Sequence, residues 1–258
     1  MSKKFDVVVI GAGPGGYVAA IRASQLGKKV AIIEKEKLGG VCLNKGCIPT
    51  KAVLKSAHSV QELKHFADLG INVKLESLDG AKALDSAHKV SDKISKGVGF
   101  LMKKNNIEVF SGHAQIKTKN TLLVEKESIE FNQLIIATGA KYRTFPGLVH
   151  DGKRLIGAWD AILMNEVPKS VGIIGAGAIG VEFAYFWKSF GADVTIYEMQ
   201  NHLLPIEDEE SSIEVEKAYK KMGINLCLGV KNVTAKANAK KAVIEFTDAK
   251  GDQKHEFD

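Results

Sequence analysis

Two cysteines five positions apart, Cys42 and Cys47, are the strongest candidates for chemistry in this sequence. Thiols at such a spacing can form a redox-active disulfide or bind a metal. In a regular helix, residues i and i+5 lie about 8 to 9 Å apart between Cα atoms, whereas a disulfide needs about 4.4 to 6.8 Å. Gly46 relaxes the backbone and Pro49 cannot donate to a helical ladder, so we expect a distorted segment in which the sulfurs can meet.

Metal binding is the alternative use of Cys42 and Cys47. No second pair of cysteines or histidines at ligand spacing accompanies them in the sequence, and we therefore expect no metal site. The third cysteine, Cys227, stands alone in an apolar run and is expected to be a small core residue. A single local pair favours redox chemistry over structural stapling.

The elements that must position the two thiols begin with a strand, a helix and a strand. Residues 5–10 have the apolar run of a buried strand, residues 14–26 indicate a helix ended by Gly27, and residues 29–34 indicate the next strand. The same order returns further on. The second set covers residues 170–174, 178–190 and 193–198.

A G-x-G-x-x-G motif lies between strand and helix in both sets, which is the pattern of a dinucleotide site. The first glycine allows a tight turn, the second lets the backbone approach a pyrophosphate, and the third lets the helix pack closely on the strand. The glycines are Gly11, Gly13 and Gly16 in the first set and Gly175, Gly177 and Gly180 in the second. The sequence therefore predicts an α/β fold with two Rossmann-like dinucleotide-binding domains, each a parallel sheet with helices and an antiparallel meander.

An acidic residue ends the second strand of each set, Glu34 and Glu198, at the same distance from the first glycine (34 − 11 and 198 − 175, both 23). Such an acid can accept hydrogen bonds from ribose hydroxyls. Glu198 would repel a 2′-phosphate, and no arginine follows it as far as Pro205, which favours NAD over NADP. Replacement of Glu198 by arginine should therefore shift the preference towards NADPH.

The remaining elements are predicted from periodicity and turn residues. Two helices are expected between the sets, followed by a strand and a small meander, and a loop at Phe145–Gly147 is expected to mark the domain boundary. After the second set we expect a helix, a strand through Cys227 and another meander. The ranges are 51–66 and 78–104 for the helices, 107–110, 114–117, 121–125, 128–131 and 133–137 for the strands, and 207–222 for the last helix.

Composition excludes other classes of function. The formal net charge is +6, but the lysines and arginines are scattered among acids and form no aromatic-interleaved stripe, so nucleic acid is not an expected partner. The apolar runs are far too short to span a bilayer and no secretory signal is visible, so we expect a cytoplasmic protein without a membrane anchor.

With the segment from Gly39 to Lys51, the Ala-Thr-Gly sequence at 137–139 and a second glycine motif that runs into Val181–Glu182, the chain closely resembles the pyridine nucleotide-disulfide oxidoreductases. The resemblance covers essentially all 258 residues. It is strongest to the branch that oxidises protein-bound dihydrolipoamide. Relatives that act on glutathione often carry an aromatic gate where this chain has Ala178, which fits that branch.

The resemblance implies FAD in the first domain, NAD in the second and a redox-active disulfide. Cys42 matches the thiol that exchanges with the dithiol substrate, and Cys47 matches the thiol beside the flavin. Lys51 and Glu182 match an ion pair near the flavin and the nicotinamide, although without the family they could be ordinary surface charges. The other positions that match cofactor contacts are Glu34, Gly112, Ala114, Thr138 and Gly139, with the backbone of His113 near adenine.

The resemblance also implies a domain arrangement and partners. We expect an FAD-binding domain over residues 1–146 and an incomplete NAD-binding domain over 147–258, without the C-terminal dimerisation domain of the family. That domain supplies a His-Glu acid/base pair, which none of the seven histidines here matches. The implied partners are lipoyl domains of 2-oxoacid dehydrogenase complexes or of the glycine cleavage system, and a second copy in a homodimer. The alternatives are a related disulfide or mercuric reductase and a non-catalytic FAD/NAD-binding module.

Overall fold

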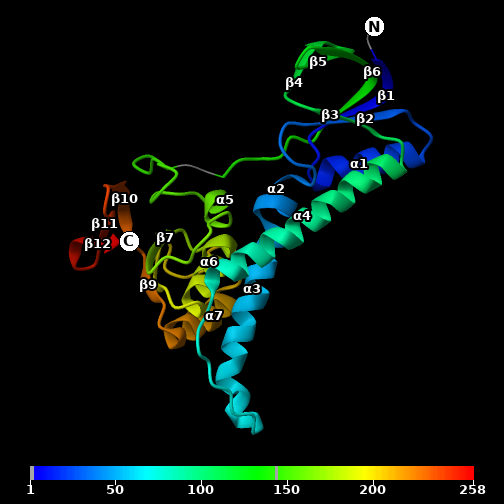
Figure 1. The fold of residues 1–258 in the computed structure, drawn as a ribbon. Helices are drawn as coiled ribbons and strands as arrows, with labels where there is room; N and C mark the ends of the chain where they lie inside the picture. The colour runs from blue at the N-terminus through cyan, green and yellow to red at the C-terminus, as the bar shows by residue number, and fades with distance from the viewer. Residues whose placement is uncertain (1–2, 143–144) are drawn as a thin grey trace. The chain divides into compact units, whose positions relative to one another are not determined.

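The computed structural model describes residues 3–142 and 145–258, and the chain divides into two compact units (Figure 1). The first unit combines the described part of Met1–Pro49 with His88–Lys141, and the second combines Thr50–Ala87 with the described part of Tyr142–Asp258. Each unit has its own parallel sheet, and each sheet carries one of the two glycine motifs.

The first unit is built on a six-stranded sheet in the order β3-β2-β1-β6-β5-β4. The first four strands are parallel, while β5 and β4 join them in antiparallel pairing. The bounds are Lys3–Ile10 for β1, Val30–Glu34 for β2, Glu108–Ser111 for β3, Ala114–Thr118 for β4, Thr121–Val124 for β5 and Glu127–Ile136 for β6.

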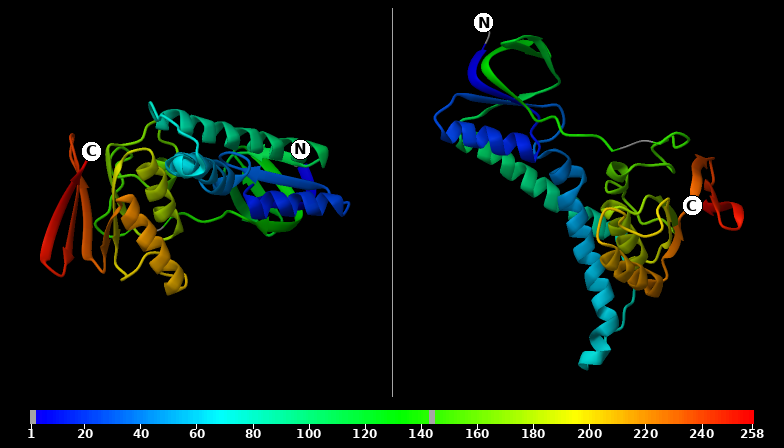
Figure 2. Two further views of the ribbon diagram at one scale, coloured as in Figure 1. Left: turned by 90° about the horizontal axis from the view of Figure 1, so that it is seen from below. Right: turned by 180° about the vertical axis from the view of Figure 1, so that it is seen from behind.

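Alternating side chains of β1 face two different layers of the first unit. Val7 and Val9 point to the helices α1 (Pro14–Gln25) and α4 (Gly80–Lys104), whose residues Val98 and Met102 are buried in the same cluster. Val8, which lies between them in the sequence, packs on the meander side with Phe110 of β3 and with apolar residues of β5 and β6. The helices α1 and α4 lie side by side along one face of this sheet (Figures 1 and 2).

The second unit repeats this layering on a smaller sheet in the order β7-β8-β9, all parallel. Val194 and Ile196 of β8 face helix α6, whereas Tyr197 faces a separate antiparallel meander. The bounds are Ser170–Ile174 for β7, Asp193–Glu198 for β8, Asn225–Leu228 for β9, Ala178–Ser189 for α6 and Glu209–Met222 for α7. The meander consists of β10 (Lys231–Ala237), β11 (Ala242–Asp248) and β12 (Gly251–Phe257).

Helix α3 (Cys47–Glu62) runs from the first unit into the second, and a 3-10 segment, η1 (Leu63–Leu69), follows it. Val53 and Ala57 of α3 are fully buried in the core of the second unit. A short helix, α5 (Ala158–Ala161), precedes β7. Among the described residues, none of the helices combines the length and apolarity that a membrane span requires.

The two parallel sheets differ in how their first strands are paired. Strand β1 has β2 on one side and β6 on the other, and Val8 and Val9 at its centre are fully buried. Strand β7 pairs with β8 alone within the part of the chain that the structure describes, and all five of its residues are partly exposed. One edge of β7 is therefore open.

The predicted fold class is confirmed, with two Rossmann-like units that each carry a meander. The prediction of two separate strands at 128–131 and 133–137 was wrong, because residues 127–136 form the single strand β6. Asn132 and Gln133 interrupt the apolar pattern as a turn would. Both residues lie on an exposed stretch of β6. The first part of β6 pairs with β5, and β6 also pairs with β1 from Ile129 to Ile136, so the strand does not need to turn.

Candidate functional site

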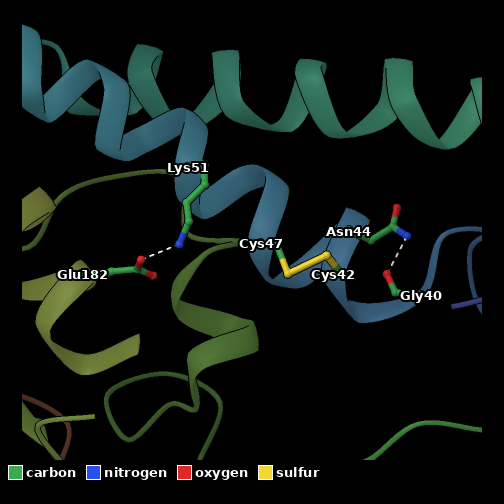
Figure 3. The surroundings of a disulfide bond; sticks show 6 residues. All are labelled: Gly40, Cys42, Asn44, Cys47, Lys51 and Glu182. Carbon is green, nitrogen blue, oxygen red and sulfur yellow. Dashed lines mark hydrogen bonds and ion pairs between the residues drawn. A yellow bond between two sulfur atoms is a disulfide. The ribbon is translucent and has the colours of Figure 1, made fainter. Parts of the chain in front are cut away.

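The Cys42–Cys47 disulfide forms because the helix stops between the two cysteines. Helix α2 (Gly40–Lys45) ends at Gly46, whose φ of −147° and ψ of −115° are not helical, and α3 begins at Cys47. This break brings the Cα atoms to 4.6 Å, inside the range for a disulfide (Figure 3). The predicted distortion at Gly46 is confirmed.

The loop that leads into Cys42 is held by side chains from two helices. The Asn44 amide donates to the carbonyl oxygens of Gly40 at 2.9 Å and Leu38 at 3.1 Å, and the first of these bonds is drawn in Figure 3. The hydroxyl of Ser95, on α4, donates to the same Leu38 carbonyl at 2.7 Å. Leu43 is buried beneath the loop. The backbone that carries Cys42 is therefore fixed before the disulfide begins.

The third glycine of each motif makes the contact that the motif predicts. A Cβ added at Gly16 would lie 1.8 Å from the carbonyl oxygen of Gly11, and a Cβ added at Gly180 would lie 2.1 Å from that of Gly175. No side chain other than hydrogen fits at either position. Helix and strand therefore approach as closely as a dinucleotide fold requires.

The N-termini of α1 and α6 are suited to hold a pyrophosphate. Their N-cap residues, Gly13 and Gly177, provide no capping side chain, and neither helix has an acidic residue in its first turn. A Cβ at Gly15 or Gly177 would meet no atom within 4 Å, so the space before each helix is open. Uncapped N–H groups at a helix N-terminus favour a bound phosphate. The residues at both sites therefore fit a dinucleotide cofactor.

The two acids, Glu34 and Glu198, make a contact that the sequence did not reveal. One carboxylate oxygen of Glu34 accepts the backbone N–H of Ala12 at 2.8 Å, and Glu198 accepts that of Ala176 at the same distance. Each remaining oxygen accepts a second backbone N–H, two residues further along, at 2.8 and 2.9 Å. Each oxygen keeps a further acceptor position for a ribose hydroxyl. The acids thus fix the glycine loops, and their contact with a ribose stays a prediction.

The loop after each acid binds the carbonyl oxygen of the same alanine whose N–H the acid accepts. Gly39 donates its backbone N–H to the carbonyl of Ala12, and Leu204 donates to the carbonyl of Ala176, both at 2.8 Å. Both donors have positive φ, +97° for Gly39 and +51° for Leu204, a region that a leucine rarely occupies. The middle of each glycine motif is therefore held by hydrogen bonds at its N–H and at its C=O.

Replacement of Glu198 by alanine tests this contact. The Glu198 side chain is buried, so the variant leaves the N–H groups of Ala176 and Gln200 without their acceptor. We expect the free energy of unfolding of the second unit to fall by about 1 to 3 kcal/mol and NADH binding to weaken. Urea denaturation and NADH titration measure the two effects. The exposed Glu207 provides the control, since Glu207→Ala should stay within about 0.5 kcal/mol of the parent. Equal stability of the two variants would contradict the prediction.

Two segments predicted to contact the first cofactor lie beside its glycine loop. Gly112, which follows β3, donates its backbone N–H to the carbonyl of Glu34 at 2.9 Å. On the other side of β1, a Cβ at Gly11 would lie 2.2 Å from the carbonyl oxygen of Ala137, the residue before Thr138 and Gly139. The second segment thus touches the glycine loop directly, and the first is linked to it through Glu34, while Ala114 begins β4 two residues after Gly112.

Lys51 and Glu182 form an ion pair in the second unit, from α3 and α6 (Figure 3). The side chain of Lys51 is 62% exposed and that of Glu182 is 25% exposed. An ion pair with this exposure contributes only about 0 to 1 kcal/mol to stability. The stability that this ion pair adds is therefore too small to explain why a lysine and a glutamate occupy positions 51 and 182. Ala178 begins α6 and is exposed.

Cys227 differs from the paired cysteines in its surroundings. It is partly buried on β9, opposite Tyr197 of β8, and packs against the meander of the second unit. Burial, and to a lesser extent the charge of Asp248, raises the pKa of the Cys227 thiol. A raised pKa keeps this thiol protonated and unreactive at neutral pH.

A glycine loop between a strand and a helix, contacted by the loop that leads into a disulfide, is typical of flavin- and nucleotide-dependent disulfide oxidoreductases. The chain belongs to the pyridine nucleotide-disulphide oxidoreductase family, whose sequence profile matches residues 5–258. Members of this family use FAD and NAD. The predicted family resemblance is confirmed.

Within the family, the curated relatives include dihydrolipoyl dehydrogenases. That of Chlorobaculum parvum is 45% identical over 235 residues, which cover 89% of this chain and 50% of the relative. That of Bacillus subtilis is 43% identical, with coverage of 90% and 52%. The chain therefore spans about half the length of these relatives.

Solved structures share the fold. LpdA from Mycobacterium tuberculosis matches with a TM-score of 0.87 at 20% identity, over 99% of this chain and 57% of that protein. The HOCl-induced flavoprotein disulfide reductase RclA from Escherichia coli matches with a TM-score of 0.80 at 25% identity, over 96% of this chain and 54% of that protein. Both are similar to the present chain along nearly its whole length.

Proposed function

We propose that this chain carries the two nucleotide sites and the redox disulfide of a dihydrolipoyl dehydrogenase. The first glycine motif, with residues 1–146, would bind FAD, and the second, with residues 147–258, would bind NAD. The observation that carries the proposal is the Cys42–Cys47 disulfide, placed directly after a loop that contacts the first glycine motif. The dihydrolipoyl dehydrogenases among the relatives support lipoamide as the substrate.

The cysteine pair would oxidise a dithiol by exchange. A thiolate of dihydrolipoamide attacks Sγ of Cys42, which forms a mixed disulfide and releases Cys47 as a thiolate. The second substrate thiol loses its proton and attacks the substrate sulfur in the mixed disulfide, so that lipoamide leaves and Cys42 becomes free. The substrate loses two electrons and two protons, and the cysteine pair gains the two electrons.

When bound, FAD would supply an acceptor for this electron pair, and NAD⁺ would supply an acceptor for a hydride. Lys51 lies one helical turn after Cys47 on α3, and its positive charge would favour the thiolate form of Cys47. Glu182, paired with Lys51, would hold that ammonium in place. Glu34 and Glu198 would position the two glycine loops and accept hydrogen bonds from the ribose of each cofactor.

The partners follow from the substrate. A protein-bound dihydrolipoamide is carried by a lipoyl domain, so we propose cytoplasmic lipoyl domains of 2-oxoacid dehydrogenase complexes or of the glycine cleavage system as partners. A homodimer is proposed for the whole enzyme.

A dithionite titration followed by visible spectroscopy tests the proposal. The protein is first loaded with FAD, and reduction by two electrons should produce a long-wavelength charge-transfer band from the Cys47 thiolate to the flavin. Binding of FAD without this band would contradict the role of Cys47. The substrate is then identified by parallel NADH-dependent assays of the whole enzyme with lipoamide, glutathione disulfide and mercuric ion. Preference for either of the last two would overturn the choice of lipoamide.

A further inference from the structure

The loop before Cys42 touches the glycine loop at the N-terminus of α1 through backbone atoms alone. This glycine loop, which contains Ala12 and Gly13, is called the first phosphate loop below. A Cβ added at Gly40 would lie 2.6 Å from the Cα of Gly13 and 3.2 Å from its nitrogen, so only a glycine allows this approach. The neighbouring Gly39 donates its backbone N–H to the carbonyl of Ala12. Two consecutive residues of the cysteine loop thus contact two consecutive residues of the glycine motif, all within the first unit.

The path from this contact to the disulfide is short and stiff. Gly40 is the first residue of α2, and Cys42 is its third. The Asn44 amide ties the carbonyl of Gly40 to the next turn of the same helix. The disulfide joins Cys42 to Cys47, the first residue of α3. A displacement of Cys42 would therefore be transmitted to Gly40, and from there to the backbone of Gly13.

We propose that Gly40 couples nucleotide binding at the first phosphate loop to the redox state of Cys42–Cys47, so that a bound diphosphate favours the disulfide over the dithiol. The inference rests on the proposed nucleotide site but needs no flavin. Reduction removes the bond that fixes Cys42 relative to α3, which loosens the support that Gly40 gives to Gly13. A cysteine thiolate formed by reduction also adds a negative charge to the segment that contacts this loop, where the bound ligand is already an anion. Both effects have the same sign.

ADP is the probe, because it carries the adenosine diphosphate half of FAD and no redox-active ring. We expect oxidised protein to bind ADP at least about fivefold more tightly than protein reduced with dithiothreitol, a coupling at the lower end of those between linked sites. By reciprocity, saturating ADP should shift the equilibrium constant for reduction by dithiothreitol by the same factor. In that reaction dithiothreitol gives up two electrons and two protons and becomes a cyclic disulfide. Calorimetry gives the ADP affinities, and mass spectrometry of alkylated peptides gives the thiol fraction at Cys42 and Cys47.

Two variants, each compared with the unmodified protein, test whether the coupling depends on Gly40 and on Asn44. Gly40→Ala should reduce it to less than about twofold, because the new Cβ forces the loop away from Gly13. Gly27→Ala is the matched control, since Gly27 also has a positive φ, +78° against +60° for Gly40, but has no atom within 4 Å of an added Cβ. The control should keep the full coupling. Asn44→Ala, which removes the side-chain hydrogen bond to the Gly40 carbonyl, should lower the coupling without placing an atom against the phosphate loop.

The outcomes separate this inference from the proposed function. Equal ADP affinity in the oxidised and reduced protein overturns the coupling and leaves the nucleotide site standing. Absence of ADP and FAD binding in both states overturns the nucleotide site, and the coupling with it. A coupling that survives in both Gly40→Ala and Asn44→Ala shows that it does not pass through Gly40. If Gly40→Ala does not fold, the comparison of the unmodified protein with Asn44→Ala decides the result.

Discussion

Gly16→Ala should prevent the first unit from folding, whereas Gly15→Ala, one position earlier in α1, should leave it folded. The added methyl at position 16 would lie 1.8 Å from the Gly11 carbonyl oxygen and 2.9 Å from its carbon, both backbone atoms that cannot turn away. Relief requires α1 to move off β1, which breaks the packing of Ala20 in the core. Overpacking of this kind costs about 3 kcal/mol or more. Thermal unfolding followed by circular dichroism, together with FAD binding, measures the loss.

Gly15→Ala controls for the change of residue type in the same helix. Its Cβ would meet no atom within 4 Å, and the substitution places a better helix former in the first turn of α1. The unfolding free energy should change by less than about 1 kcal/mol, towards greater stability. Similar melting curves for the two variants would show that close helix-strand contact is not what the third glycine provides.

Cys42→Ser in the whole enzyme should abolish the proposed dihydrolipoamide oxidation, with a loss of at least about three orders of magnitude in kcat, while FAD stays bound. Serine cannot form a disulfide with Cys47, so there is no sulfur–sulfur bond for the substrate thiolate to attack. The unpaired Cys47 should then give the charge-transfer band without any reductant, and Cys47→Ser should not. NADH formation and the visible spectrum measure the two effects.

Cys227→Ser is the matched control for that experiment, because it makes the same substitution at a cysteine outside the disulfide. It should keep turnover within about twofold of the parent and leave the spectrum unchanged. Turnover by Cys42→Ser at the level of Cys227→Ser would rule out Cys42 as the exchanging thiol.

The fold could be predicted most accurately where a short strand rich in β-branched residues keeps one pairing pattern along its whole length. Residues 170–174 and 193–198 were predicted with the bounds that the structure has, although β8 is mostly buried and β7 is partly exposed throughout. The division at 132–133 failed because the pairing changes within one strand. Strand β6 is partly exposed and changes partner along its length, so its polar residues follow no single alternation.

The site could be predicted where the type and the spacing of the residues carry the signal. The glycine motifs, the acids at equal spacing and the paired cysteines all stand out as letters in the sequence. The hydrogen bonds that the backbone N–H groups of Ala12 and Ala176 donate to the two acids could not be predicted, because they do not depend on the type of the donor residue. The contact of Gly40 with Gly13 was missed for a related reason, since it depends on the distance between two main chains and on no particular side-chain chemistry.

The open edge of β7 has a consequence for how the protein behaves in solution. Gly11 packs against the peptide that follows β6, whereas a Cβ at Gly175 would meet nothing within 4 Å, because no strand occupies the corresponding place among the described residues. Unpaired main-chain groups beside partly exposed Val171 and Ile173 form a template onto which any extended polypeptide can add. We therefore expect the 258-residue chain to associate through this edge at high concentration, and we expect a strand that pairs with β7 to suppress that association.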